Sequence, residues 1–340
     1  MTTYVLGAGA SAHVGYPLTT ALGSDLLNWM KKQTRFDLYA PTARSLEDTF
    51  GSVANLEDLL TEMVNSVLAY AADTSERTAS RTQFQQDYFV LTCALQERFA
   101  EIRENPAHAY EQFCAHVVSP GDCILTFNYD VSVDRELRRA GKWNVGDGYG
   151  FTIPNLPDKS PVKILKLHGS SNWLASLWTS FGNGFGPRPV LSDGEMGFLG
   201  YTNQRDIDFR NAQSGIRPTL ILPTPSKDFF VNLGDRQELR QFFDDLWNQA
   251  KNALSQSNRL VICGYSMPDT DERATELLLG NLIGRGSRIT VVSGSKSGDI
   301  ARRFLEQGYK YATAAEKNRF EEWVVSSAAA QSTSQVVGLS

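Results

Sequence analysis

Short apolar runs separated by longer amphipathic stretches dominate the hydropathy pattern of this chain. Each run spans only a few residues and ends in small or polar residues, which is typical of a buried strand. Such runs occupy residues 4–6, 123–127, 162–167, 220–222, 259–263 and 288–292. Between them, apolar residues recur at helical spacing in segments 18–30, 55–68, 84–103, 239–254 and 271–282. Asn55 lies directly before an apolar stretch and is expected to cap its helix.

The order of these elements predicts the fold class. Strands and helices alternate at both ends of the chain, which favours an α/β fold with a doubly wound parallel sheet. Residues 35–118 are mainly helical, so we expect a helical insertion or cap within a discontinuous domain of residues 1–34 and 119–325. Residues 174–217 show no clear period and predict an irregular insertion, while the small and polar residues 326–340 predict a mobile tail.

Composition and charge narrow the class of protein. Lys and Arg number 33 against 38 Asp and Glu, so the net charge of −5 does not indicate a basic nucleic-acid surface. The 41% of hydrophobic residues excludes disorder over most of the chain. No run approaches the roughly 18 apolar residues of a membrane span. No basic segment precedes a signal-peptide core, so we expect a cytoplasmic location.

The cysteines carry no sign of a metal site or of a disulfide framework. No two of them form the CxxC pair that structural zinc sites use. We therefore expect no metal and four small buried hydrophobic side chains. The cysteines are Cys93, Cys114, Cys123 and Cys263.

The glycine turn after the strand at 4–6 is the first candidate binding site. Gly7 and Gly9 permit a close backbone approach, and a following helix start supplies N–H groups, so the turn suits a phosphate. The alternative is that the glycines serve helix–sheet packing. A dehydrogenase is not favoured, because its fingerprint needs an acidic residue at the end of a second strand about 20 residues later. Here Asp25 lies on a helix instead.

Polar residues follow two further strands. Asn128 can hold a ribose hydroxyl, a carboxamide or a water, and Asp130 can orient a neighbour, although a simple Asx turn is the alternative. His168 is a natural general base near neutral pH, with a structural histidine as the alternative. Because the carboxyl ends of parallel strands share one edge, where open α/β sheets bind ligands, we expect these residues to gather there.

Four motifs together resemble one protein family. In chain order they are GAGAS at 7–11, TFNYD at 126–130, KLHGSSNW at 166–173 and GYSMPDTD at 264–271. The set resembles the prokaryotic sirtuin-like (SIR2-like) family, the branch used as NAD-consuming effectors in antiphage defence. The resemblance spans about residues 4–295, and its most specific parts are HGSxNW and GYSMPDTD.

The resemblance implies a Rossmann-like sheet that binds NAD at its carboxyl edge and cleaves the bond between nicotinamide and ribose. Asn128 and His168 match the family's catalytic Asn and His, and Asp130 matches the Asp of the same motif as Asn128. Ser293 stands where many sirtuins have an Asn near the adenine ribose, which departs from the pattern. The residues matching the remaining cofactor-binding positions are Gly7, Ala8, Gly9, Ser11, Gly264 and Ser266.

The chain also departs from the deacylating sirtuins. Those proteins carry a zinc module of paired CxxC motifs, and segment 174–217 stands in its place here. Their peptide cleft depends on that module, so water is favoured as the acceptor. The resemblance therefore implies an NAD+ hydrolase in which Asn128 positions water and ribose and His168 takes a proton. The alternatives are a protein ADP-ribosyltransferase or deacylase, and a non-enzymatic NAD or ADP-ribose sensor.

Control of such an enzyme is expected to come from assembly, because no segment resembles a sensor domain. We expect a homo-oligomer with the helical block 35–118 as a gate. Some family members act with a HerA-type hexameric DNA-translocating ATPase, which by analogy is the expected partner. Neither a membrane nor direct nucleic-acid binding is expected.

Overall fold

The computed structural model divides the chain into two compact units. It describes residues 1–34, 36–69, 74–105, 109–152, 159–176, 188–189, 216–223, 237–268, 271–280 and 283–337. The first unit consists of Met1–Tyr16, Arg103–His168 and Gln241–Ser340, and the second of Pro17–Ile102 and Gly169–Arg240. Segment 35–118 is thus shared: its residues up to Ile102 belong to the second unit and the rest to the first.

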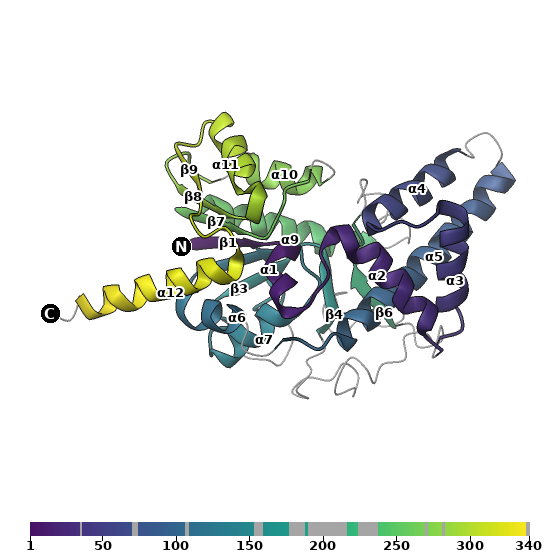
Figure 1. Ribbon diagram of the computed structural model, residues 1–340, viewed down its shortest axis with the longest axis horizontal. Coiled ribbons are helices and arrows are strands. Elements are labelled where there is room, and N and C mark those ends of the chain that lie inside the picture. Colours follow the sequence, from purple (N-terminus) through teal and green to yellow (C-terminus); the bar gives the residue numbers. More distant parts are fainter. Residues whose placement is uncertain are drawn as a thin grey trace. The chain divides into compact units, whose positions relative to one another are not determined.

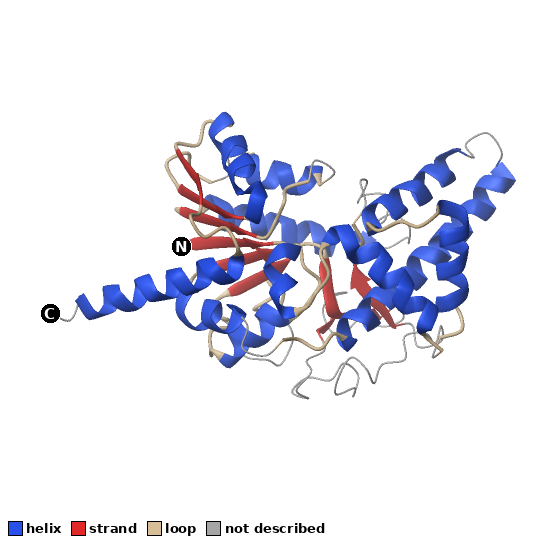
Figure 2. Ribbon diagram, in the orientation of Figure 1, coloured by secondary structure: helices blue, strands red, loops and turns tan. Residues whose placement is uncertain are grey.

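A six-stranded parallel sheet forms the core of the first unit (Figure 2). The strand order is β3-β2-β1-β7-β8-β9, and every pairing is parallel. Strands buried on both faces are nearly continuous apolar runs, which is why the sequence predicted five of the six. The strands are β1 (Thr2–Leu6), β2 (Cys123–Thr126), β3 (Lys163–Lys166), β7 (Arg259–Cys263), β8 (Arg288–Val292) and β9 (Tyr311–Ala314).

The chain winds outward from β1 in both directions. Strands β2 and β3 extend the sheet on one side of β1, and β7, β8 and β9 extend it on the other. In register, Leu6 pairs with Thr126 on one side and with Cys263 on the other. The segments that follow Leu6, Thr126 and Cys263 therefore leave the sheet at the same position along the strand direction. Open α/β sheets bind ligands at such a reversal of winding.

Helices flank this sheet, as the doubly wound prediction requires (Figure 1). Helix α11 packs on β8 and β9, and α12 packs on α6 and η2. Helix α12 also covers much of the predicted tail. The described helices of this unit are α1 (Ala8–Ser11), η1 (Ala12–Val14), α6 (Ala109–Gln112), η2 (Phe113–Val117), α7 (Ser132–Arg139), α9 (Gln237–Ser255), α10 (Glu272–Leu279), η6 (Gly294–Lys296), α11 (Ser297–Glu306) and α12 (Phe320–Val337). Helix α9 belongs to this unit from Gln241 onward.

In the part that the structure describes, the second unit combines four helices with a small antiparallel sheet of order β5-β4-β6. The predicted cap is confirmed, because the side-chain oxygen of Asn55 accepts a hydrogen bond from the Glu57 N–H at 3.1 Å. The amide of Gln96 joins α5 to β4 by donating to the Ser171 carbonyl at 2.7 Å. The elements are α2 (Thr19–Lys32), α3 (Tyr39–Phe50), α4 (Leu56–Ala69), α5 (Thr74–Glu101), β4 (Gly169–Ser176), β5 (Arg188–Pro189) and β6 (Ile216–Leu220).

The prediction of a strand at 220–222 is wrong in two respects. Strand β6 ends at Leu220, and it belongs to the antiparallel sheet. Most of the predicted irregular insertion, 174–217, lies outside the described residues, and its described parts are strand residues of that same sheet. None of the described helices has the length and apolar character needed to cross a membrane.

Candidate functional site

The residues singled out from the sequence lie where five neighbouring strands of the parallel sheet end. The glycine loop follows β1, and the pair Asn128 and Asp130 follows β2. His168 follows β3, the GYS loop, residues 264–266, follows β7, and Ser293 follows β8. The expected gathering of polar residues along one edge is therefore present in the first unit.

The glycine loop and the GYS loop pack backbone against backbone. The Gly7 N–H donates to the Cys263 carbonyl at 3.0 Å, and the Gly9 N–H donates to the Gly264 carbonyl at 2.9 Å. A Cβ on Gly7 would lie 2.6 Å from the Tyr265 Cα, and one on Gly264 would lie 2.0 Å from the Ala10 nitrogen. These contacts support the packing alternative, because both glycines fit closely against the neighbouring loop and the Gly9 N–H at the helix start already binds a protein carbonyl.

Gly9→Ala is expected to destabilise the first unit. A methyl group at this position would lie 2.9 Å from the Gly264 Cα, so the backbone of one loop must shift. Overpacking of this kind typically costs about 1–3 kcal/mol. Urea denaturation measures the loss. The matched control is Gly298→Ala on α11, where no atom lies within 4 Å of the added Cβ and alanine favours the helix. Equal stability of Gly9→Ala and wild type would contradict the packing role.

A buried hydrogen-bonded network joins the glycine loop to the segment after β2. The Asn128 side-chain amide donates to the Gly7 carbonyl at 2.9 Å and to the Ser11 hydroxyl oxygen at 3.0 Å. That hydroxyl donates to the Asp130 carboxylate at 2.7 Å and lies 2.9 Å from the Tyr110 hydroxyl. Because a serine hydroxyl has one hydrogen, Tyr110 is the donor in the last contact.

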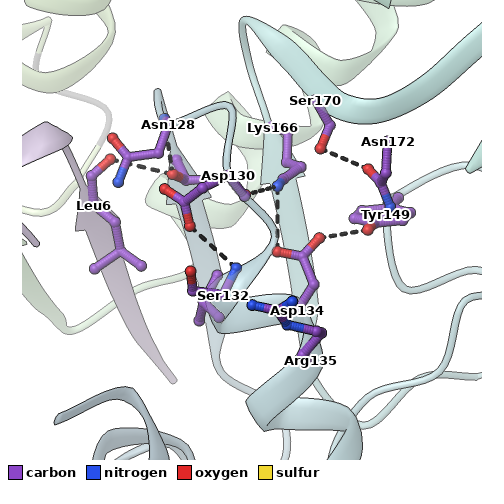
Figure 3. Close-up of polar contacts among 12 residues, drawn as sticks. Leu6, Asn128, Asp130, Ser132, Asp134, Arg135, Tyr149, Lys166, Ser170 and Asn172 are labelled. Carbon is purple, nitrogen blue, oxygen red and sulfur yellow. Dashed lines mark hydrogen bonds and ion pairs between the residues drawn. The ribbon is translucent and has the colours of Figure 1, made fainter. Parts of the chain in front are cut away.

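The protonation of Tyr110 agrees with this assignment. Burial, together with the nearby Asp130 carboxylate, raises the pKa of Tyr110 well above its ordinary value, so the phenol keeps its proton. The second oxygen of Asp130 accepts from the Ser132 N–H at 3.1 Å, where α7 begins (Figure 3). The Asx-turn alternative is therefore correct for one carboxylate oxygen, while the other oxygen contacts Ser11.

His168 is buried among aromatic rings and lies near a carboxylate that sequence reasoning did not select. Its ring centroid is 5.1 Å from that of Phe127 and 6.4 Å from that of Trp247. Its Nε2 lies 3.7 Å from Oδ2 of Asp271, the residue before α10. Asp271 is the final residue of the GYSMPDTD motif, but strand ends alone do not indicate which loop residue reaches a neighbouring strand.

The remaining predicted residues differ in their surroundings. Ser266 is exposed. Ala8 begins the single helical turn α1. The Ser293 N–H donates to the Ser297 hydroxyl at 2.7 Å. Within the described part of the chain, the Ser293 hydroxyl oxygen is buried and has no hydrogen-bond partner. A buried hydroxyl of this kind at a strand end suits a polar ligand.

The cysteines are buried, as the sequence predicted. All four are free and buried. Burial raises the pKa of Cys123 to about 12 and also raises the pKa of Cys114 and Cys263, so these thiols are poor nucleophiles. Among the described residues, no group of three or more His, Cys, Asp or Glu side chains could hold a metal ion.

Comparison with known proteins finds similarity only to solved structures. No protein-family model and no curated protein matches the chain. A mutant Sir2 homologue in complex with ADP-ribose has 12% identity and a TM-score of 0.44, covering 98% of this chain and 93% of that chain. Sir2 bound to an acetylated peptide has 13% identity and a TM-score of 0.41, with coverages of 96% and 91%. Sir2Tm bound to a propionylated peptide has 14% identity and a TM-score of 0.39, with the same coverages.

Proposed function

We propose that this protein is an NAD+ hydrolase that cleaves the bond between nicotinamide and ribose. The observation that carries the proposal is the arrangement of polar residues at the carboxyl edge of the parallel sheet. There the buried network of Ser11, Asn128 and Asp130 lies beside the strand that leads into His168. The motifs that contain these residues are those that resemble the NAD-consuming sirtuin-like family. The buried Ser293 hydroxyl at the same edge fits a ribose hydroxyl.

The proposed reaction needs a water, a base and a leaving group. The C1′–N bond breaks and its electron pair leaves with nicotinamide, which departs as a neutral molecule because the ring nitrogen of NAD+ is positively charged. The water oxygen bonds to C1′, and its proton passes to His168. The products are nicotinamide, ADP-ribose and a proton.

Asn128 is suited to position the water or a ribose hydroxyl. Two hydrogen bonds from its side-chain nitrogen, to the Gly7 carbonyl and the Ser11 hydroxyl, fix the plane of the amide. The side-chain oxygen is then held in one direction as an acceptor. A preset orientation of this kind lowers the entropic part of the barrier. The Asp130 carboxylate, linked through Ser11, adds negative charge near a centre that becomes positive in the transition state.

Release of nicotinamide from NAD+ tests this function directly. The purified full chain is expected to yield free nicotinamide and free ADP-ribose in equal amounts, as resolved by chromatography. Asn128→Ala is expected to lower the rate by a factor of about 100 or more, through lost positioning. The matched control is Asn252→Ala, which removes an exposed asparagine of α9 and is expected to be silent.

Other outcomes would favour the two alternatives. ADP-ribose attached to protein, with little of it free, would indicate a transferase. Tight binding of NAD+ or ADP-ribose without nicotinamide release would indicate a sensor. Either result would contradict hydrolysis.

We further propose that the hydrolase depletes cellular NAD as an effector of antiphage defence. The support is the motif resemblance, together with the toxicity that unrestrained NAD cleavage would have. Assembly with itself or with a HerA-type ATPase is the proposed control. Measuring NAD in infected cells that express the wild type or Asn128→Ala tests the role, and equal NAD levels in both would contradict it.

A further inference from the structure

Asp271 is a buried carboxylate that the proposed reaction does not yet use. Its Oδ1 accepts a hydrogen bond from the Ala274 N–H at 3.3 Å, which caps α10. Its Oδ2 accepts from the Tyr265 hydroxyl at 3.1 Å and lies 3.7 Å from Nε2 of His168. The Asp271 and His168 side chains are 8% and 7% exposed. One carboxylate therefore contacts a helix start, a phenol and the candidate base.

The groups around the His168 ring are mostly aromatic. Phe127 and Trp247 approach the ring, and Tyr265 stacks on Phe127 with centroids 4.4 Å apart. Among the charged groups on the neighbouring helices α9 and α10, Arg273 places its guanidinium 4.5 Å over the Trp247 ring and forms an ion pair with Asp244. In so apolar a setting, a carboxylate beside an imidazole has a stronger effect than it has in water.

From this geometry we infer that Asp271 is the positioning residue of the base His168. This inference rests on the proposed hydrolase function. Nε2 is the ring nitrogen near Asp271, so the carboxylate favours the tautomer with its proton on Nε2. Nδ1 is then the nitrogen that accepts the proton of the attacking water. Asp271 stabilises the imidazolium that forms, and Tyr265 holds the carboxylate in place through its hydroxyl.

The test must separate this role from capping of α10. Asp and Asn are nearly equal as N-cap residues, so Asp271→Asn keeps the cap and removes the charge. We expect Asp271→Asn to unfold at the wild-type temperature and to lower kcat by a factor of about 100. Tyr265→Phe keeps the ring stack and is expected to have a smaller effect. The matched control is Asp299→Asn, an exposed carboxylate in the first turn of α11, with unchanged activity.

The pH dependence of activity distinguishes the two roles of Asp271, because a residue that only caps α10 would not change it. A neutral base is active, so activity rises with pH through the pKa of His168. A nearby carboxylate favours the charged imidazolium, and its removal shifts that acidic limb to lower pH. The same shift is expected in the NMR titration of the His168 ring, assigned by the loss of its signal in His168→Gln.

The titration does not depend on turnover. It therefore separates failure of this inference from failure of the proposed function. If the wild type cleaves no NAD+ but Asp271→Asn still lowers the His168 midpoint, the contact stands and the hydrolase function fails. An unchanged midpoint, or full activity with an unchanged pH profile in Asp271→Asn, would overturn the role of Asp271.

Discussion

His168→Ala is expected to abolish NAD+ cleavage while leaving the fold intact. His168 supplies the base of the proposed reaction, and loss of a general base typically costs a factor of about 10²–10⁴ in rate. Its ring lies at the end of β3 among aromatic side chains, and alanine there removes no backbone hydrogen bond. Nicotinamide release measures the effect, and circular dichroism checks the fold.

A second histidine provides the matched control for this prediction. His116→Ala removes an exposed ring on η2 and is expected to leave the rate unchanged. A His168→Ala protein that keeps a rate within threefold of wild type would remove His168 from the mechanism. A loss of cleavage accompanied by loss of folding would show that the ring is structural.

Lys166→Met is expected to cause the largest loss of stability among these variants. The Lys166 side chain is 0% exposed. Its amino group donates to the Asp130 carbonyl at 2.5 Å and pairs with the Asp134 carboxylate at 3.2 Å (Figure 3). The Tyr149 hydroxyl also donates to that carboxylate. Methionine would leave Asp134 as a buried charge without its cation, which costs about 3–5 kcal/mol. Urea denaturation measures this loss.

Removing both charges distinguishes a broken ion pair from a poorly packed methionine. The double variant Lys166→Met with Asp134→Asn has no unpaired charge, and Asn can still accept from Tyr149. It is expected to recover most of the lost stability, because replacing both members of a buried pair is often nearly neutral. A single variant within about 1 kcal/mol of wild type would show that the pair contributes little.

Most of the parallel sheet could be predicted because five of its six strands are largely buried on both faces. Strands β1, β2, β3, β7 and β8 are apolar runs, and such runs are visible in the sequence. Strand β9 was missed because three of its four residues are exposed and it forms one edge of the sheet. The antiparallel sheet was missed because β4 pairs with β6 about forty residues away, and no local pattern encodes that pairing.

Only those residues of the candidate site that directly follow a predicted strand could be identified from the sequence. The rule that parallel strands end at one edge predicts that Asn128, Asp130 and His168 share that edge of the sheet, and in the structure they follow the adjacent strands β2 and β3. It did not select Asp271, whose reach toward His168 depends on the path of the loop before α10. Nor did it select Lys166, because a lysine at a strand end is normally expected to be exposed.

The central position of β1 has a consequence for the timing of synthesis. Strand β1 pairs with β7, and more than 250 residues separate the paired positions Thr2 and Arg259. A ribosome adding about 5–20 residues per second needs about 10–50 seconds to cover that interval. During it, β1 has no β7 partner, and the Gly9–Gly264 contact does not exist. A nascent chain therefore lacks the assembled candidate site, so the proposed NAD+ cleavage cannot begin on a polysome before the GYS loop has emerged.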